Sequence, residues 1–121
     1  MKNENAFFKN QTLLRLMGEP FQVLTEDLFF QSKFAATVKH IDNTVIFVSK
    51  ENQRPDKALI VDLQHQDALE VLKNRKNWTY CFSEHLQTER MAEAKKLGAK
   101  VVLSRGAFFN QLGEILKEIQ R

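Results

Sequence analysis

From Phe21 onward, short apolar runs alternate with longer stretches in which apolar residues recur every three or four positions. Short apolar runs are typical of buried strands, and the longer spacing is typical of helices that pack on one face. Strands interleaved with helices form parallel sheets. The pattern therefore predicts an α/β fold, a three-layer sandwich in which helices cover both faces of a parallel sheet.

The apolar runs predict five strands: Phe21 to Thr25, Thr44 to Val48, Ala58 to Leu63, Trp78 to Phe82 and Lys100 to Leu103. The third run is the clearest, because a continuous apolar stretch suits a strand that is covered on both faces. A sheet built from five such β/α units commonly has the strand order 2-1-3-4-5. We expect that order here.

Helical spacing recurs between the predicted strands, but one connection is short. Only about nine residues separate Val48 from Ala58 and Pro55 is among them, whereas a parallel crossover usually needs about a dozen or more. We therefore expect the second helix to be shortened to one turn or absent. Four other helices are expected from the apolar residues that they contain. The first contains Phe30, Phe34, Val38 and Ile41, and the second, a short one, contains Ala68 and Leu72. The third runs from Leu86 to Leu97, and the last contains Phe108, Leu112, Ile115 or Leu116, and Ile119.

The first twenty residues stand outside this alternation. Their apolar side chains precede a helix stop at Gly18 and Pro20, and they are Phe7, Phe8, Leu13, Leu14, Leu16 and Met17. We predict an N-terminal helical extension over residues 1–20 and an α/β domain over residues 21–121. The apolar side of the extension has to be buried on the domain's own surface or against a second copy of the chain. A homodimer would use this segment or the final helix.

Composition narrows the classes of partner. Eighteen Lys and Arg against fifteen Asp and Glu give a net charge of +3, spread along the chain, whereas nucleic-acid binders usually concentrate charge or carry a recognisable motif. No stretch approaches the roughly eighteen apolar residues of a membrane span, and the N-terminus lacks a signal peptide. The single cysteine, Cys81, excludes an intrachain disulfide and is expected to be an inert buried thiol. These features predict a cytoplasmic protein that binds neither nucleic acid nor membrane.

Three carboxylates follow strands that should be neighbours. In the order 2-1-3-4-5, ligands bind where the order reverses, outside the carboxyl ends of the first and third strands. Glu26 and Asp27 follow the first strand, and Asp62 ends the third. Clustered carboxylates favour a divalent cation, and Mg²⁺ commonly uses one or two carboxylates plus a phosphate. The pattern predicts a Mg²⁺ site, although Asp27 can instead cap the first helix and Asp62 can be an ordinary polar end of a strand.

Further residues extend this pattern: Ser83 ends the fourth strand, Leu97-Gly98-Ala99 precede the fifth, and Arg105 closes it. With them, the stretch from Phe21 to Arg121 resembles the receiver domain of bacterial response regulators, which has a flavodoxin-like fold. The resemblance implies that Asp62 accepts a phosphoryl group from a histidine kinase as an aspartyl phosphate. It also implies that Glu26, Asp27 and Asp62 hold Mg²⁺, and that Ser83 and Arg105 contact the phosphoryl group.

The sequence also departs from that family. Arg105 stands where receivers place Lys, and Gly106 stands where a Pro would follow; Arg and Lys are not interchangeable in such a site. A second hypothesis is therefore a pseudo-receiver, which keeps the scaffold but signals through protein contacts without phosphoryl transfer. In receivers the output face is the fourth helix, fifth strand and fifth helix, so we expect contacts at Glu89, Arg90, Lys96 and the final helix. Neither hypothesis makes the chain an enzyme.

Two alternatives belong to other classes. His65 and His85 should lie at the same sheet edge as the carboxylates, and histidines with carboxylates can bind a metal that supports hydrolysis. No HExxH or comparable motif accompanies them. A nucleotide-binding flavodoxin-like domain would use the same edge, but the four glycines form neither GxGxxG nor a P-loop. A small metal-dependent hydrolase and a nucleotide-binding domain remain the alternatives.

Overall fold

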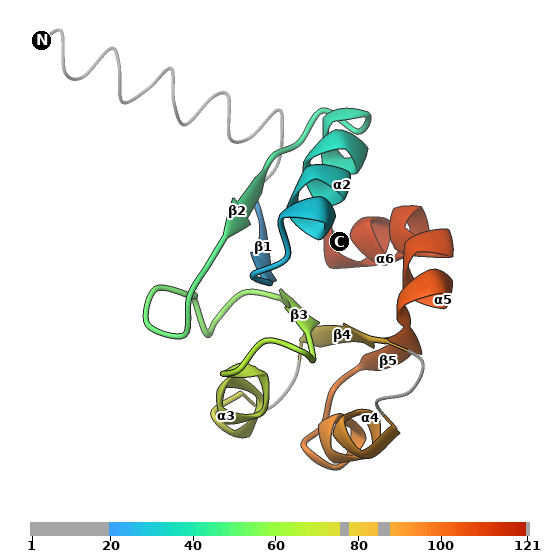
Figure 1. The fold of residues 1–121 in the computed structure, drawn as a ribbon. Coiled ribbons are helices and arrows are strands. Elements are labelled where there is room, and N and C mark those ends of the chain that lie inside the picture. The colour runs from blue at the N-terminus through green and yellow to red at the C-terminus, as the bar shows by residue number, and fades with distance from the viewer. Residues whose placement is uncertain (1–19, 76–77, 85–87, 121) are drawn as a thin grey trace, which may run out of the picture.

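The computed structural model describes residues 20–75, 78–84 and 88–120. Its centre is a parallel five-stranded sheet of order β2-β1-β3-β4-β5 (Figure 1). The strands are β1 (Phe21–Leu24), β2 (Val45–Phe47), β3 (Leu59–Asp62), β4 (Thr79–Ser83) and β5 (Val101–Ser104). The predicted fold class and strand order are confirmed, and each predicted strand boundary is within one residue of the observed one.

Helices cover both faces of the sheet. α2 (Leu28–Lys39), α5 (Arg105–Asn110) and α6 (Leu112–Gln120) lie on one face, and α3 (Ala68–Lys73) and α4 (Thr88–Lys96) lie on the other (Figure 1). The predicted stripe of α2 is confirmed, since Phe30, Phe34 and Val38 are buried. The first two residues of the predicted helix from Leu86 to Leu97 lie outside the described residues.

The final helix differs from the prediction, which placed one continuous helix there. The structure interrupts it at Gln111, whose amide is shared between the carbonyl oxygens of Ala107 and Phe108 at 3.1 Å each. Such a shared bond tightens the end of a helix. The apolar spacing continues across the interruption, so Phe108, Leu112, Ile115 and Leu116 are all buried.

Each face of the sheet has its own apolar core. On the α2 side, Phe82 of β4 lies among Phe30, Phe34, Phe108 and Phe109, with ring centroids 5.1–5.9 Å from its own. The opposite side packs Leu24, Leu59, Val61 and Cys81 against α3 and α4. Burial raises the pKa of the Cys81 thiol to about 12. Cys81 is therefore the inert buried thiol that the sequence predicts.

No helix connects β2 to β3 in this fully described segment. A tight turn replaces it, in which the Ser49 amide donates to Asn52 Oδ1 at 2.6 Å and the Gln53 amide donates to the Ser49 carbonyl oxygen at 3.1 Å. The prediction of a shortened or absent second helix is confirmed in its stronger form. The chain from residue 49 to residue 57 is a loop.

Two buried polar side chains hold this loop on the sheet. Gln22 Nε2 donates to the carbonyl oxygens of Arg54 and Ala58 at 3.0 and 3.1 Å, and Gln22 Oε1 accepts from the Arg54 amide at 2.6 Å. The Arg75 guanidinium donates to Gln53 Oε1 and to the carbonyl oxygens of Arg54 and Lys57. Hydrogen bonds to a glutamine and an arginine thus attach this connection to the sheet, whereas helix packing would attach it in a regular β/α unit.

The predicted N-terminal extension lies outside the described residues except for Pro20, which leads into β1. Across the described ranges, none of the helices has the length and apolar character that crossing a bilayer requires.

Candidate functional site

Asp62 lies at the carboxyl edge of the sheet beside Thr25. The register pairs Leu24 of β1 with Val61 of β3, so the next residue along each strand is also adjacent. Thr25 Oγ1 donates to Asp62 Oδ2 at 2.8 Å, and the Gln64 amide donates to Asp62 Oδ1 at 3.0 Å. Both carboxylate oxygens therefore have neutral donors, and only 4% of the residue is exposed.

Burial raises the pKa of the Asp62 carboxyl. The hydrogen bonds from Gln64 and Thr25 act in the opposite direction because they favour the charged form. Asp27 adds a smaller upward effect through repulsion, and His65 a downward one. Within the described ranges, no Lys or Arg forms an ion pair with Asp62, so its charge is balanced mainly by dipoles.

Asp27 acts on the Asp62 carboxyl through repulsion, but both Glu26 and Asp27 have other partners. Asp27 Oδ1 accepts from the amides of Phe29 and Phe30 at 2.9 and 3.2 Å, which makes Asp27 the N-cap of α2. Glu26 Oε1 is 3.4 Å from Nε2 of His65. The helix-cap role that the sequence left open for Asp27 is confirmed.

His65 is buried, since only 8% of it is exposed. Its Nδ1 accepts from the Asp67 amide at 3.0 Å, which leaves Nε2 to donate to Glu26. His65 is thus held by the start of α3 and by Glu26. His85, the other predicted histidine, lies outside the described residues.

Ser83 and Arg105 form no bond with Asp62. Ser83 ends β4 opposite Ser104 of β5, and its buried hydroxyl has no hydrogen-bond partner in the described part of the chain. Arg105 begins α5 instead of closing β5, which ends at Ser104. Its half-exposed guanidinium pairs with Glu84 at 3.7 Å and lies 5.4 Å from the Phe30 ring centroid. Their predicted contact with a phosphoryl group stays a prediction.

The predicted Mg²⁺ site is a poor fit to these contacts. Among residues 20–75, 78–84 and 88–120, no group of three or more His, Cys, Asp or Glu side chains is arranged to hold a metal ion. Asp62 is bonded at both oxygens, Asp27 caps α2, and Glu26 faces His65. The three carboxylates are therefore each directed at a different protein partner, and not at one shared position.

Sequence reasoning missed two residues at this edge. Thr25 was treated only as the end of a strand, although its hydroxyl donates to Asp62. Arg90 was assigned to a contact surface, but its guanidinium donates to the carbonyl oxygen of Leu63, directly after Asp62. The hydroxyl of Thr25, at the end of a strand next to the predicted site, was a signal that could have identified it. Nothing local in α4 distinguishes Arg90 from its charged neighbours.

Replacing Asp62 by Asn is expected to stabilise the domain at neutral pH by about 1 kcal/mol, the scale of ordinary single-residue effects. Burial holds the pKa of the Asp62 carboxyl in the folded state above the ordinary 3.8. The protonated carboxyl therefore contributes its full stability below pH 3.8, and this contribution is lost as the pH rises through the folded-state pKa. An uncharged amide avoids that loss and can still bond to Thr25 and Gln64.

Urea unfolding over a pH series measures this effect. The advantage of Asp62→Asn should be largest at neutral pH and should shrink as the pH falls toward 3.8. Asp56→Asn is the matched control, because Asp56 is exposed and pairs only with exposed Arg54 in the described ranges. A variant less stable than the parent at neutral pH would contradict the assignment of Asp62 as a disfavoured buried charge.

Comparison with known proteins agrees with this architecture. No protein-family model matches the chain, and none of the curated proteins matches it in sequence. Among solved structures, it is similar to a response regulator from Thermotoga maritima, with a TM-score of 0.62 and 15% sequence identity. The match covers 84% of this chain and 97% of that one. At this identity the likeness shows a shared fold, so the receiver-like fold expected from the sequence is confirmed.

Proposed function

We propose that the chain is a receiver-like signalling domain that acts through protein contact and does not use Asp62 as a phosphoacceptor. The observation that carries this proposal is the bonding of Asp62, whose two oxygens accept from Thr25 and Gln64 while Arg105 pairs with Glu84. The receiver-like fold supports the signalling role, and the altered site supports independence from phosphorylation.

Phosphoryl transfer to a carboxylate demands more than these contacts supply. The attacking oxygen has to be ionised and accessible, and cations have to stabilise the charge on the transferring group. Asp62 is buried, its pKa is raised, and no basic side chain in the described ranges pairs with it.

The proposed contact surface is the exposed side of α4 together with β5 and the final helix, which is divided into α5 and α6. Glu89 and Lys96 are exposed there. Arg90 joins α4 to the Leu63 carbonyl, so any rearrangement beside Asp62 would act on α4 through this bond. The partner is a protein whose charges complement this face, and a histidine kinase is not required for its binding.

The hydrolase and nucleotide alternatives receive no support from the geometry. His65 is engaged with Asp67 and Glu26, so it is not directed at Asp62 as a metal ligand. A pocket of about 230 Å³ lies at β1 and β2, lined by Gln22, Ile46 and Arg54 among others, and not beside Asp62.

The proposal is tested in the organism that encodes the chain, by comparing substitutions with the phenotype of a deletion. A contact-based domain should keep its function with Asp62→Asn and lose it with Glu89→Lys, because only the second reverses charge on the contact face. Lys39→Glu, at the exposed end of α2, is the control and should behave as wild type. Loss of function with Asp62→Asn alone would overturn the proposal in favour of phosphoryl signalling.

A further inference from the structure

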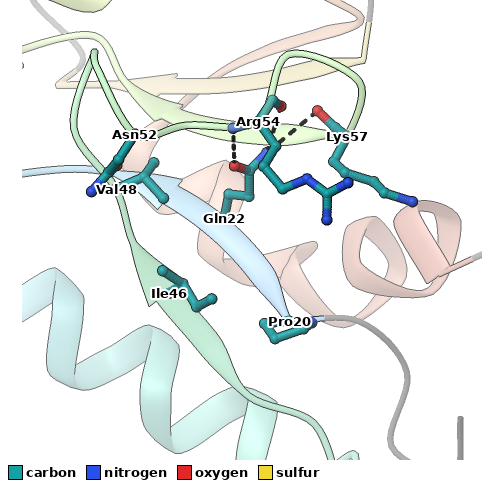
Figure 2. Close-up of a pocket in the computed structure, with 7 residues that line it drawn as sticks. All are labelled: Pro20, Gln22, Ile46, Val48, Asn52, Arg54 and Lys57. Atoms are coloured by element: carbon teal, nitrogen blue, oxygen red, sulfur yellow. Dashed lines mark hydrogen bonds between the residues drawn. The ribbon is translucent and has the colours of Figure 1, made fainter. Parts of the chain in front are cut away.

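Among the described residues, no helix covers the part of the sheet at β1 and β2 on the α3 and α4 side. The pocket at β1 and β2 is lined by Pro20, Gln22, Ile46, Val48, Asn52, Arg54 and Lys57 (Figure 2). Figure 2 shows Gln22 bonded to the loop at Arg54, while Ile46 and Pro20 lie at the other side of the opening. Ile46 is 51% exposed, which is unusual for a large apolar side chain on a sheet.

The open area belongs to the face that α3 and α4 cover elsewhere. Gln22 and Ile46 are partners in the register, so they share a face. Leu24 and Val48, two residues further along each strand, pack in the core under α3 and α4, and side chains alternate between faces. A helix between β2 and β3 would normally cover this area, but only the loop 49–57 does so, and it leaves the pocket open.

The sequence before β1 resembles the connection that leads from α4 into β5. Gly98, with φ of 92°, ends α4 three residues before β5 begins at Val101. Gly18 likewise precedes Phe21 by three residues. Leu97 stands before Gly98 and packs on the α3 and α4 side of the core, and Met17 stands before Gly18. The same order of residues thus leads into both strands.

The residues before Gly18 also have, in their sequence, the apolar spacing of a packed helix. Leu14 and Met17 are three residues apart, as are Ala94 of α4 and Leu97 directly after α4, which both contact the core. Phe7 precedes Leu14 by seven residues, or about two helical turns. Arg15 would fall on the opposite side of such a helix.

We propose that residues 7–17 pack as an amphipathic helix on the open face of β1 and β2 of the same chain, with Leu14 and Met17 over Ile46. The connector supports packing within one chain. Only Gly18, Glu19 and Pro20 separate Met17 from β1, and Pro20 itself lines the pocket. A short connector gives an effective concentration on the order of millimolar, which a second copy reaches only at high protein concentration.

Disulfide trapping in the full chain tests this packing. Leu14→Cys and Leu13→Cys are each combined with Ile46→Cys and oxidised with copper phenanthroline at low protein concentration. Both pairs should form a disulfide within one chain, since a bridge requires Cα atoms within about 7 Å. Cys81 can stay in place because it is fully buried. The control pair, Arg15→Cys with Ile46→Cys, should react about tenfold more slowly because its thiol faces away.

Each other outcome overturns the proposal. Covalent dimers would show that a second copy covers the face. Equal reaction of the Arg15→Cys pair, or no reaction in any pair, would show that the segment does not dock there.

Hydrogen exchange on the unsubstituted chain gives a second test that does not depend on how the cysteine variants fold. The amides of residues 10–17 should be protected in the parent chain and should lose protection in Ile46→Asp. Unprotected amides over residues 10–17 in the parent chain would also overturn the proposal.

Discussion

The Phe82→Ala variant is expected to lose about 3–5 kcal/mol of unfolding free energy, the range for truncating a buried Phe. Phe82 is 1% exposed and contacts four other Phe rings from α2 and α5. Its removal leaves a cavity that rigid neighbours fill only partly. Phe82 is also the register partner of Asp62, and its carbonyl oxygen accepts from the Leu63 amide, so the loss should reach the candidate site.

Urea unfolding followed by circular dichroism measures this loss. Phe29→Ala is the matched control, because Phe29 is the same residue type but 69% exposed, and it should change stability by less than about 0.5 kcal/mol. Equal effects of the two variants would contradict the placement of Phe82 at the centre of this core.

The Arg75→Met variant is expected to lose about 2–4 kcal/mol of unfolding free energy, because it removes three hydrogen bonds that a buried, charged side chain donates to the loop. Methionine keeps much of the apolar length of the side chain but removes all three hydrogen bonds to the loop. The carbonyl oxygens of Arg54 and Lys57 would lose this donor. The loop 49–57 should then exchange amide protons faster than the core strands.

Urea unfolding together with hydrogen exchange over residues 49–57 checks this result. Arg54→Met provides the comparison, since the Arg54 guanidinium is exposed and pairs with an equally exposed Asp56. Surface pairs of this kind contribute little, so a change below about 0.5 kcal/mol is expected. If the two variants were equally stable, the loop would not depend on Arg75.

The strands and their order could be predicted because a strand that is buried on both faces has a continuous apolar run in its sequence. Leu59, Ile60 and Val61 are such a run, and all three are buried. The location of Asp62 followed from the rule for the sheet edge. The break at Gln111 could not be predicted, because the apolar spacing of α5 and α6 runs through it unchanged.

The contacts that define the site were harder to predict because they join residues far apart in the chain. Thr25 and Asp62 are 37 residues apart, and Arg90 and Leu63 are 27 apart. Gln22 was hidden within an apolar strand, although its amide holds the loop 49–57. Local periodicity indicates which face of an element a residue occupies. It does not indicate which distant polar group the side chain of that residue contacts.

The bonding of Asp62 bears on function in a way that its position alone does not. Its location at the strand end fits a phosphoacceptor. Its partners, however, are the neutral donors of Thr25 and Gln64, and Arg105 is paired with Glu84. We therefore propose that the chain keeps a receiver-like scaffold in which Asp62 stabilises the sheet edge instead of accepting a phosphoryl group.

Intact mass measurement after incubation with acetyl phosphate and Mg²⁺ tests that claim most directly. An ordinary receiver domain serves as the positive control, and Asp62→Asn serves as the negative one. We expect the chain to gain no mass under conditions that label the control receiver. A gain of one phosphoryl group in the chain, absent from Asp62→Asn, would contradict the account.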